Sequence, residues 1–226
     1  MIRLEPAGAE ALLLVLADEP DAWLPQRIAT LAGVLRRELG HLLLDLVPGW
    51  TTLLLHYDLT RTDHLALAER IEPLLEAWLT APAVAETGQL HEIPIWYCGE
   101  DLAWVAESCG LSIGELVDIH SGAEYRVGAI GFSPGFAYLG GLDPRLALPR
   151  RSSPRIRVPA GSLAIAERQT AIYPQASPGG WHLLGLCPWT LFDAHREPPC
   201  PLALGDRVRF FAIDEARYRA EGGGDS

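Results

Sequence analysis

The chain has 226 residues, 49% of them hydrophobic, which is enough for one or two globular domains with a sizeable core. Its 29 acidic and 18 basic residues give a net charge of −11, which argues against nucleic acid or an anionic membrane as the main partner. All 18 basic residues are arginine, so the chain has no lysine for a phosphate-binding loop, a Schiff base or an attached biotin. If ATP or biotin takes part, another chain must hold it.

The first part of the chain, residues 1–85, is interpreted as a small α+β domain with the element order ββαββα. Short apolar runs predict strands at 11–17, 42–47 and 51–57. Between the first two runs, apolar residues recur every three or four positions, with Pro25 in the first turn and Gly40 as a stop, which predicts an amphipathic helix. A second helix is expected over 63–79, and Pro73 in its interior should kink or split it.

The next segment contains a boundary and two helices. Residues 86–89 are polar and include a glycine, so we expect a linker there. A strand at 90–97 and a helix at 101–109 follow. Ser112, with Glu115 three positions later, forms a capping box that predicts the start of another helix.

Beyond these helices the chain is rich in turn residues, and 11 of its 18 prolines lie between Pro134 and Pro201. Short strands are predicted at 125–130, 156–158, 163–166, 170–173, 182–186 and 207–213. Many short strands separated by regular turns indicate a closed β-barrel, which we expect to span residues 90–215. The glycine-rich end, residues 216–226, is expected to be a flexible tail.

One segment, 131–135, matches the G-x-S-x-G pattern of a nucleophile elbow. The residue after the serine is Pro134, which has no N–H for an oxyanion hole, and the following residues are rich in glycine where an elbow needs a helix. We therefore interpret the segment as a rigid turn between strands. Its aromatic neighbours Phe132, Phe136 and Tyr138 are expected to fill the core or to line a pocket.

Five arginines lie within thirteen residues, and no acidic residue lies between Asp143 and Glu167 to neutralise them. They are Arg145, Arg150, Arg151, Arg155 and Arg157. Because a guanidinium group binds carboxylates and phosphates with two parallel hydrogen bonds, a small anionic molecule or an acidic partner surface would suit this segment. The alternative is that these arginines form ordinary ion pairs with acidic residues of the first domain.

Other polar residues have two interpretations each. His120, at a predicted helix end, could act as a general acid or base, or could cap the last carbonyl groups of the helix. Gln169, Thr170 and Tyr173 could line the mouth of the barrel or lie on an edge strand. No histidine pattern suggests a metal site, and the four cysteines show no C-x-x-C pairing, so free thiols in a cytoplasmic protein are expected.

A set of short motifs resembles one known family. They are Gly131-Phe132-x-Pro134-Gly135-Phe136-x-Tyr138-Leu139, Pro149-Arg150, Pro154-Arg155, Val158-Pro159-Ala160-Gly161-Ser162, Gln169-Thr170-x-Ile172-Tyr173-Pro174, Ser177-Pro178-Gly179-Gly180-Trp181 and Gly205-Asp206-x-Val208-x-Phe210. The combination resembles the PxpB family, the small subunit of ATP-dependent 5-oxoprolinase. Its members are also labelled KipI-like or allophanate hydrolase subunit 1.

The resemblance implies an α+β amino-terminal domain and a cyclophilin-like β-barrel domain. It also implies a larger PxpC or KipA partner subunit and a third subunit, PxpA, of the LamB/YcsF type. Together they open 5-oxo-L-proline to L-glutamate with ATP and Mg²⁺, which act at the level of the complex. Two alternatives remain, a KipI-like inhibitor of a histidine kinase and one half of a biotin-dependent carboxyltransferase of the urea and allophanate pathway.

The matching positions give candidate site residues for a small anionic substrate. The substrate-binding candidates are Pro134, Gly135, Phe136, Arg150, Arg155, Gln169 and Tyr173, and the catalytic candidate is His120. The substrate carboxylate is expected near Arg150 or Arg155. The chain departs from the family pattern at Glu167-Arg168 and at Leu186-Cys187, and these differences bear on which substrate it takes.

Overall fold

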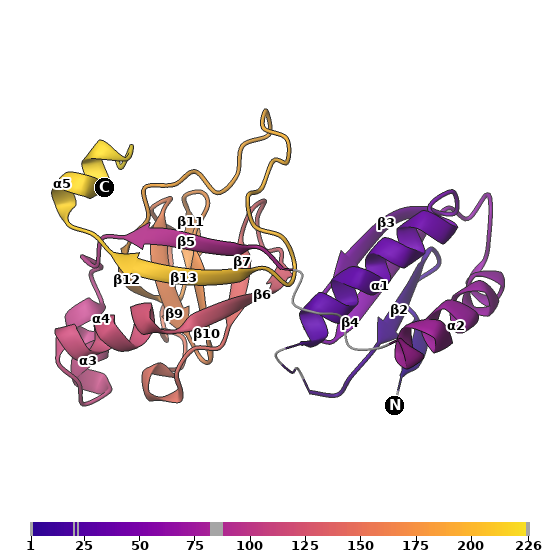
Figure 1. Ribbon diagram of the computed structural model, residues 1–226, viewed down its shortest axis with the longest axis horizontal. Helices are drawn as coiled ribbons and strands as arrows, with labels where there is room; N and C mark the ends of the chain where they lie inside the picture. Colours follow the sequence, from indigo (N-terminus) through magenta and orange to yellow (C-terminus); the bar gives the residue numbers. More distant parts are fainter. Residues whose placement is uncertain (1, 20, 22, 82–87, 225–226) are drawn as a thin grey trace. The chain divides into compact units, whose positions relative to one another are not determined.

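The computed structural model describes residues 2–19, 21, 23–81 and 88–224, and Figure 1 shows their secondary structure. The chain forms two compact units, one up to Gly88 and one from Gln89 onward. Of the expected linker at 86–89, residues 86 and 87 lie outside the described residues. Each unit is described here by itself.

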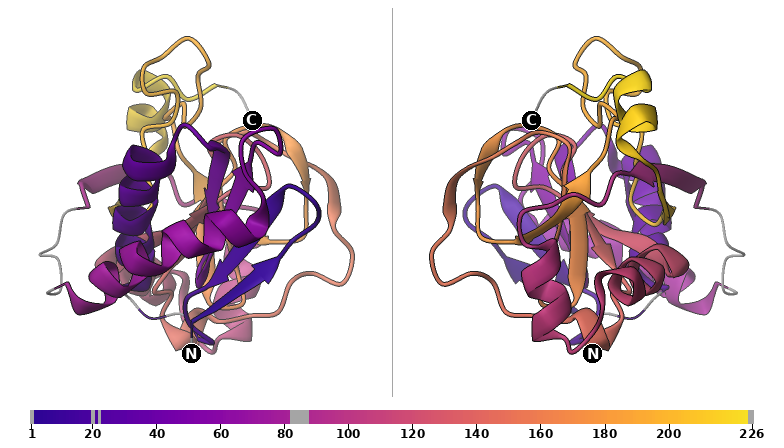
Figure 2. Two further views of the ribbon diagram at one scale, coloured as in Figure 1. Left: turned by 90° about the vertical axis from the view of Figure 1, so that its right-hand side faces the viewer. Right: turned by 90° about the vertical axis from the view of Figure 1, so that its left-hand side faces the viewer.

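The first unit has the expected order ββαββα. Its elements are β1 (Arg3–Pro6), β2 (Ala11–Val15), α1 (Leu24–Leu39), β3 (Leu43–Pro48), β4 (Thr52–Tyr57) and α2 (His64–Thr80). The strands form one antiparallel sheet in the order β1-β2-β4-β3. Both helices lie on one face of this sheet (Figures 1 and 2), with Ile28, Leu31 and Leu35 of α1 fully buried, as the spacing predicts.

Helix α2 is continuous across Pro73, so the expected split does not occur. Proline removes only its own N–H from the helix ladder. Asp63 caps the start of the helix by accepting from two backbone N–H groups, and Ile71 and Trp78 are buried on either side of the proline. Capping and burial on the sheet face therefore outweigh the one missing hydrogen bond.

The second unit contains the expected barrel. Its elements are β5 (Leu90–Ile95), α3 (Leu102–Ser108), α4 (Ile113–Gly122), β6 (Glu124–Ile130), β7 (Ala137–Gly140), the short helix η1 (Pro144–Leu146), β8 (Arg155–Val158), β9 (Ser162–Ala166), β10 (Gln169–Ile172), β11 (Ser177–Gly179), β12 (His182–Leu186), β13 (Arg207–Ala212) and α5 (Glu215–Ala220). The capping box at Ser112 and Glu115 is present at the start of α4.

Seven strands form one curled sheet in the order β12-β9-β10-β7-β6-β13-β5, and β8 pairs separately with β11. The two outermost strands of the large sheet meet again just after β5. There Trp96 and Leu186 exchange backbone hydrogen bonds of 2.9 and 2.8 Å. This bridge joins the two edges of the sheet, and the fold class is α+β with a barrel-like second unit, as expected.

Strand alternation divides the apolar side chains of the second unit into two clusters. Inward residues such as Leu139, Ile165 and Ile172 pack with the helices α3 and α4 in the main core. Outward residues of the same strands form a second cluster that includes Ala171 and Tyr173. Because alternate side chains of a strand point to opposite faces, one short strand serves both clusters.

The end of the chain differs from the expected flexible tail. Residues 215–220 form α5, which begins at an Asp214 cap. Tyr218 of α5 is buried and its ring lies 5.4 Å from the ring of Trp96. Residues 216–220 of the expected tail are therefore helical, with the Asp214 cap and the packing of Tyr218 on Trp96 as the contacts that hold them. No strand is predicted at the positions of β1, β7 and β11, and glycines and prolines obscure the patterns of the last two.

Within the described ranges, no helix is both long enough and apolar enough to cross a membrane.

Candidate functional site

An aromatic cluster on the outer side of the large sheet contains two of the candidate residues, Phe136 and Tyr173. We call it the aromatic face, and it consists of Phe132, Phe136, Tyr138, Tyr173 and Trp181. Phe136 is its centre, with its ring 4.8 Å from Tyr138, 5.3 Å from Tyr173 and 5.9 Å from Trp181. The rings meet edge to face, which is the favourable geometry for aromatic pairs.

The turn at 131–135 positions Phe132 and Phe136. The N–H of Gly131 donates to the carbonyl of Phe136, and the N–H of Phe136 donates to the carbonyl of Ser133, both at 3.0 Å. Strand β7 follows directly, with no helix after the serine, so the turn is not a nucleophile elbow. The hydroxyl of Ser133 is buried and has no hydrogen-bond partner among the described residues.

Two residues of this turn have positive φ angles. Gly135 has φ 79°, and a side chain there would place its Cβ 2.7 Å from the carbonyl oxygen of Leu191. Phe132 has φ 72° although it is not glycine, and its side chain is 62% exposed. A bulky residue in this conformation is strained, and such strain persists only where the surrounding structure fixes the turn. The turn therefore holds one large ring in solvent beside the buried Phe136.

Strand β10 presents Gln169 and Ala171 on the outer side, and Tyr173 follows on the same side. Tyr173 is buried, and Gly179 packs so closely on its ring that a Cβ at this glycine would collide with it. Burial raises the pKa of Tyr173, whereas the charges of Arg150 and Arg155 and the backbone N–H of Trp181 lower it. The hydroxyl of Tyr173 thus stays protonated near neutral pH in a positively charged surrounding.

Arg150 lies at the rim of the aromatic face. Its guanidinium carbon lies 5.9 Å from the ring centre of Trp181, and its side chain is 57% exposed. The nearest carboxylate, that of Glu167, is 3.8 Å away, which is too far for a strong hydrogen bond. Arg150 is therefore a cation that an incoming carboxylate could bind.

Arg155, the other candidate for the carboxylate, is already occupied. Its Nη2 donates to Asp101 at 2.8 Å and to Glu100 at 3.1 Å, and its side chain is only 16% exposed. Asp101 also accepts from Arg151 at 3.0 Å and from the N–H of Leu183 at 2.8 Å. Burial raises the pKa of Asp101, but the hydrogen bonds from Arg155 and from the N–H of Leu183 together have a larger opposite effect. The pKa of Asp101 is therefore lowered overall, and the carboxylate remains charged.

These ion pairs correct one expectation. The acidic partners of Arg151 and Arg155 belong to the second unit, at the start of α3, and not to the first domain. Arg145 pairs with its own neighbour Asp143. Asp101 is absent from the candidate residues predicted from the sequence. It lies about fifty residues before Arg151 and Arg155, so no local pattern connects it with them.

His120 lies on the inner side of β10 and is fully buried. The hydroxyl of Thr170 donates to the carbonyl of Ala164, so its oxygen accepts from Nε2–H of His120 at 3.1 Å. Nδ1 is then unprotonated and accepts from the hydroxyl of Tyr97 at 2.9 Å. Burial lowers the pKa of His120 to about 3, in agreement with a neutral ring. The structure gives the ring a part in positioning β10 and does not bring it to the aromatic face.

The chemistry available at the aromatic face is binding rather than covalent catalysis. Burial raises the pKa of Cys200, the cysteine beside Gly135, and it also raises the pKa of Cys98 to about 11 and that of Cys187 to about 12, two cysteines outside the aromatic face. None of the three is a thiolate at neutral pH. No cluster of three or more metal-ligating side chains occurs in the part of the chain that the structure describes.

Comparisons with known proteins agree with this architecture. Residues 2–202 match the family model described as carboxyltransferase domain, subdomain C and D. The chain is 36% identical to the 5-oxoprolinase B subunit of Bacillus subtilis, covering 96% of this chain and 95% of that protein. It is 39% identical to the 5-oxoprolinase B subunit of Escherichia coli O157:H7, covering 93% and 90%.

Among solved structures, TTHA0988 superposes with a TM-score of 0.79 at 39% identity. The alignment covers 95% of this chain but 40% of TTHA0988, so the present chain corresponds to less than half of that longer polypeptide. With a family model that covers most of its length and relatives that align almost end to end, the chain belongs to the family of 5-oxoprolinase B subunits and contains a carboxyltransferase C and D domain.

Proposed function

We propose that the chain is the B subunit of an ATP-dependent 5-oxoprolinase, which opens 5-oxo-L-proline to L-glutamate. The observation that carries the proposal is the near end-to-end similarity to two proteins named as the B subunit of 5-oxoprolinase. The aromatic face with Arg150 at its rim supports it, because it offers one available cation beside a broad apolar surface. That combination suits a small ring that carries a carboxylate.

In this proposal Arg150 binds the carboxylate of 5-oxoproline, and the ring lies against the aromatic face. Tyr173 and Gln169 provide polar groups at its edge, and the turn with Pro134 and Gly135 holds Phe136 in position. Arg155 acts one step removed, since it fixes Asp101 and the chain around Trp181. His120 acts from inside the barrel by holding Thr170, the neighbour of Gln169.

The proposal includes other subunits. The described residues contain neither a lysine nor a metal cluster, so we assign ATP and Mg²⁺ to a larger PxpC/KipA-like subunit or to a PxpA (LamB/YcsF-like) subunit. No step of the ATP chemistry is assigned to this chain. Its four free cysteines suit a reducing compartment, and we place the complex in the cytoplasm.

The test is reconstitution. Glutamate release from 5-oxoproline with ATP and Mg²⁺ is measured for the chain alone, for the other two subunits together, and for all three. We expect turnover only with all three subunits, and a loss of about tenfold or more when Arg150→Ala replaces the wild type, the scale of one charge-assisted hydrogen bond. Full activity without this chain, or turnover by the chain alone, would contradict the proposal.

A second candidate is one half of a biotin-dependent carboxyltransferase, which the description of the family model favours. It predicts carboxyl transfer between carboxybiotin and a urea-like acceptor when a biotin carrier is supplied. The same preparation distinguishes the two functions. Carboxyl transfer to urea without any glutamate release from 5-oxoproline would favour the second candidate.

A further inference from the structure

The second unit contains a hollow that shares Arg150 with the residues proposed to bind 5-oxoproline, whereas its other lining residues have no direct contact in that proposal. It has a volume of about 480 Å³ and lies between the start of α3 and the loop 149–153 before β8. Volumes of this size are typical of small-molecule sites. Its lining residues include Trp104 of α3 and His182 of β12.

The indole of Trp104 gives the hollow a planar, apolar surface. Trp104 is 50% exposed although it is a large aromatic residue, and its ring stacks on that of His182 at 4.8 Å and 21°. His182 is 3% exposed, and its Nε2 donates to the carbonyl of Pro149 at 2.9 Å. The loop carbonyl of Pro149 thus fixes the ring of His182, and the stacking on this ring fixes the indole of Trp104.

The hollow is also lined by cationic side chains and by hydroxyl groups that can donate hydrogen bonds. Arg150 and Arg151 lie next to the exposed serines Ser152 and Ser153. Asp101 also lines the hollow, but its carboxylate is shared between Arg151, Arg155 and a backbone N–H. Among the residues that the structure describes, the carboxylate nearest to Arg150 is that of Glu167 at 3.8 Å, so the lining of the hollow retains positive charge for an anion.

Two buried polar atoms at this hollow have no partner in the described structure, Nε of Arg151 and Nδ1 of His182. With Nε2 of His182 donating to Pro149, its Nδ1 is an unfilled acceptor, whereas Nε of Arg151 is an unfilled donor. Leaving such groups unsatisfied costs roughly 1–3 kcal/mol each. A ligand or a bound water molecule could satisfy them after a small side-chain movement.

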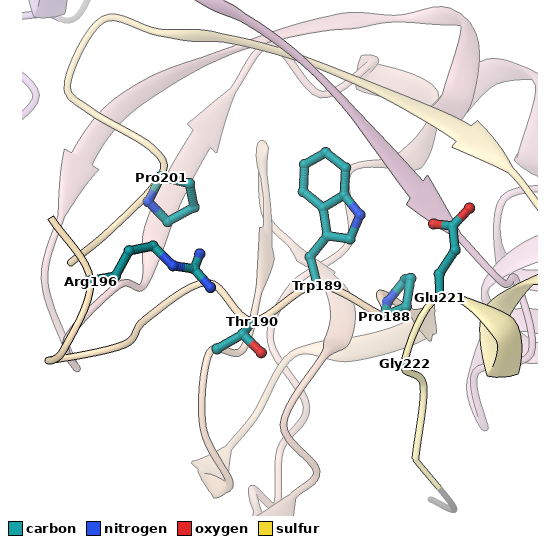
Figure 3. Close-up of a pocket in the computed structure, with 7 residues that line it drawn as sticks. All are labelled: Pro188, Trp189, Thr190, Arg196, Pro201, Glu221 and Gly222. Carbon is teal, nitrogen blue, oxygen red and sulfur yellow. The ribbon is translucent and has the colours of Figure 1, made fainter. Parts of the chain in front are cut away.

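We propose that this hollow binds a small oxyanion attached to a planar ring, with the ring on Trp104 and the carboxylate or phosphate on Arg151 and Ser152. A second hollow of about 490 Å³, lined by Trp189, Thr190 and Arg196 (Figure 3), provides the comparison. It also combines an indole with an arginine, but its acidic residue Glu221 is already paired with Arg217 at 2.6 Å. None of its lining residues contributes an unpartnered buried polar atom among those described.

The test uses the purified full chain and four probes in titration calorimetry. Benzoate and phenyl phosphate combine a ring with an anion, inorganic phosphate has only the charge, and benzamide has only the ring. We expect at least one of the first two to bind roughly tenfold or more tightly than inorganic phosphate and benzamide, since two wall contacts act together. The stronger of the two identifies the oxyanion as carboxylate or phosphate.

Matched variants locate the binding. Trp104→Ala and Ser152→Asp should each weaken the tighter probe by about tenfold or more, because one removes the stacking surface and the other adds a negative charge. Trp189→Ala and Thr190→Asp make the same changes at the second hollow and should leave the affinity unchanged. Both Ser152 and Thr190 are exposed, so these substitutions keep the fold. Absence of binding, or equal losses at the two hollows, would overturn the proposal without bearing on glutamate release by the complex.

Discussion

Nε2 of His120 donates a 3.1 Å hydrogen bond to Oγ1 of Thr170 in the interior of the second unit, and the hydroxyl of Thr170 in turn donates to the carbonyl of Ala164. This chain of donors fixes the neutral form of the ring. It also connects α4 with β10 and β9. The residue that sequence analysis proposed for acid–base chemistry therefore holds the strand whose outer side carries the aromatic face.

The first prediction concerns the pH dependence of stability. The pKa of His120 is about 3 in the folded chain against 6.5 for a free histidine, so the unfolded chain binds the proton more readily between these values. The free energy of unfolding should fall as the pH decreases from 6.5 towards 3, by at most about 1.4 kcal/mol per pH unit from this group. At higher pH the contribution is complete and constant.

The measurement is urea denaturation at several pH values for the wild type and for His120→Gln. The variant should be less stable at pH 7 but should lose the part of the pH dependence that His120 causes. His195→Gln is the control, because His195 is exposed. If the free energy of unfolding of His120→Gln depends on pH below 6.5 as steeply as that of the wild type, His120 is not a neutral buried ring in the folded chain.

The second prediction separates the two candidate arginines. Arg155→Ala removes the 2.8 Å bond to Asp101 and should lower the free energy of unfolding by about 2–3 kcal/mol, because a buried carboxylate loses one of its partners. Arg150→Ala, at an exposed position, should change stability by less than about 0.5 kcal/mol. Thermal and urea denaturation of both variants measure this difference, and equal stability losses would contradict it.

The third prediction tests the turn that positions Phe136. Gly135→Ala should destabilise the chain by about 2–4 kcal/mol, since alanine is unfavourable at φ 79° and its Cβ would approach the carbonyl of Leu191. Gly131→Ala is a matched control, because open space surrounds that position and its φ is not positive. Comparable unfolding midpoints for the two variants would show that the turn is not constrained as described.

The fourth prediction concerns α5. Tyr218→Ala should lower stability by about 2 kcal/mol, because it removes a buried ring that packs on Trp96. Ala216→Ser, at an exposed position of the same helix, should have little effect. Hydrogen exchange of the amides of α5 provides a second measurement. Amides that exchange as fast as in an unfolded peptide would restore the expectation of a flexible tail.

Local patterns in the sequence were sufficient for most of the secondary structure. The spacing of Ile28, Leu31 and Leu35 predicted α1, and Ser112 with Glu115 predicted the start of α4. These signals are contained within one element, because helix periodicity and capping depend on residues three or four positions apart. The proline after Ser133 likewise argues against a nucleophile elbow by itself, and the strand β7 that follows the turn agrees with it.

Contacts between distant segments were decided only by the tertiary structure. Nothing near Arg155 in the sequence indicates that Asp101 neutralises it, and nothing near His120 indicates that Thr170 accepts a hydrogen bond from its ring. Whether Tyr218 orders the last helix likewise depends on Trp96, more than a hundred residues earlier. The sequence determined which side chains could bind an anion, but the folding of the sheet into a barrel decided which of them are already paired and which remain available, because charge and burial depend on neighbours in space.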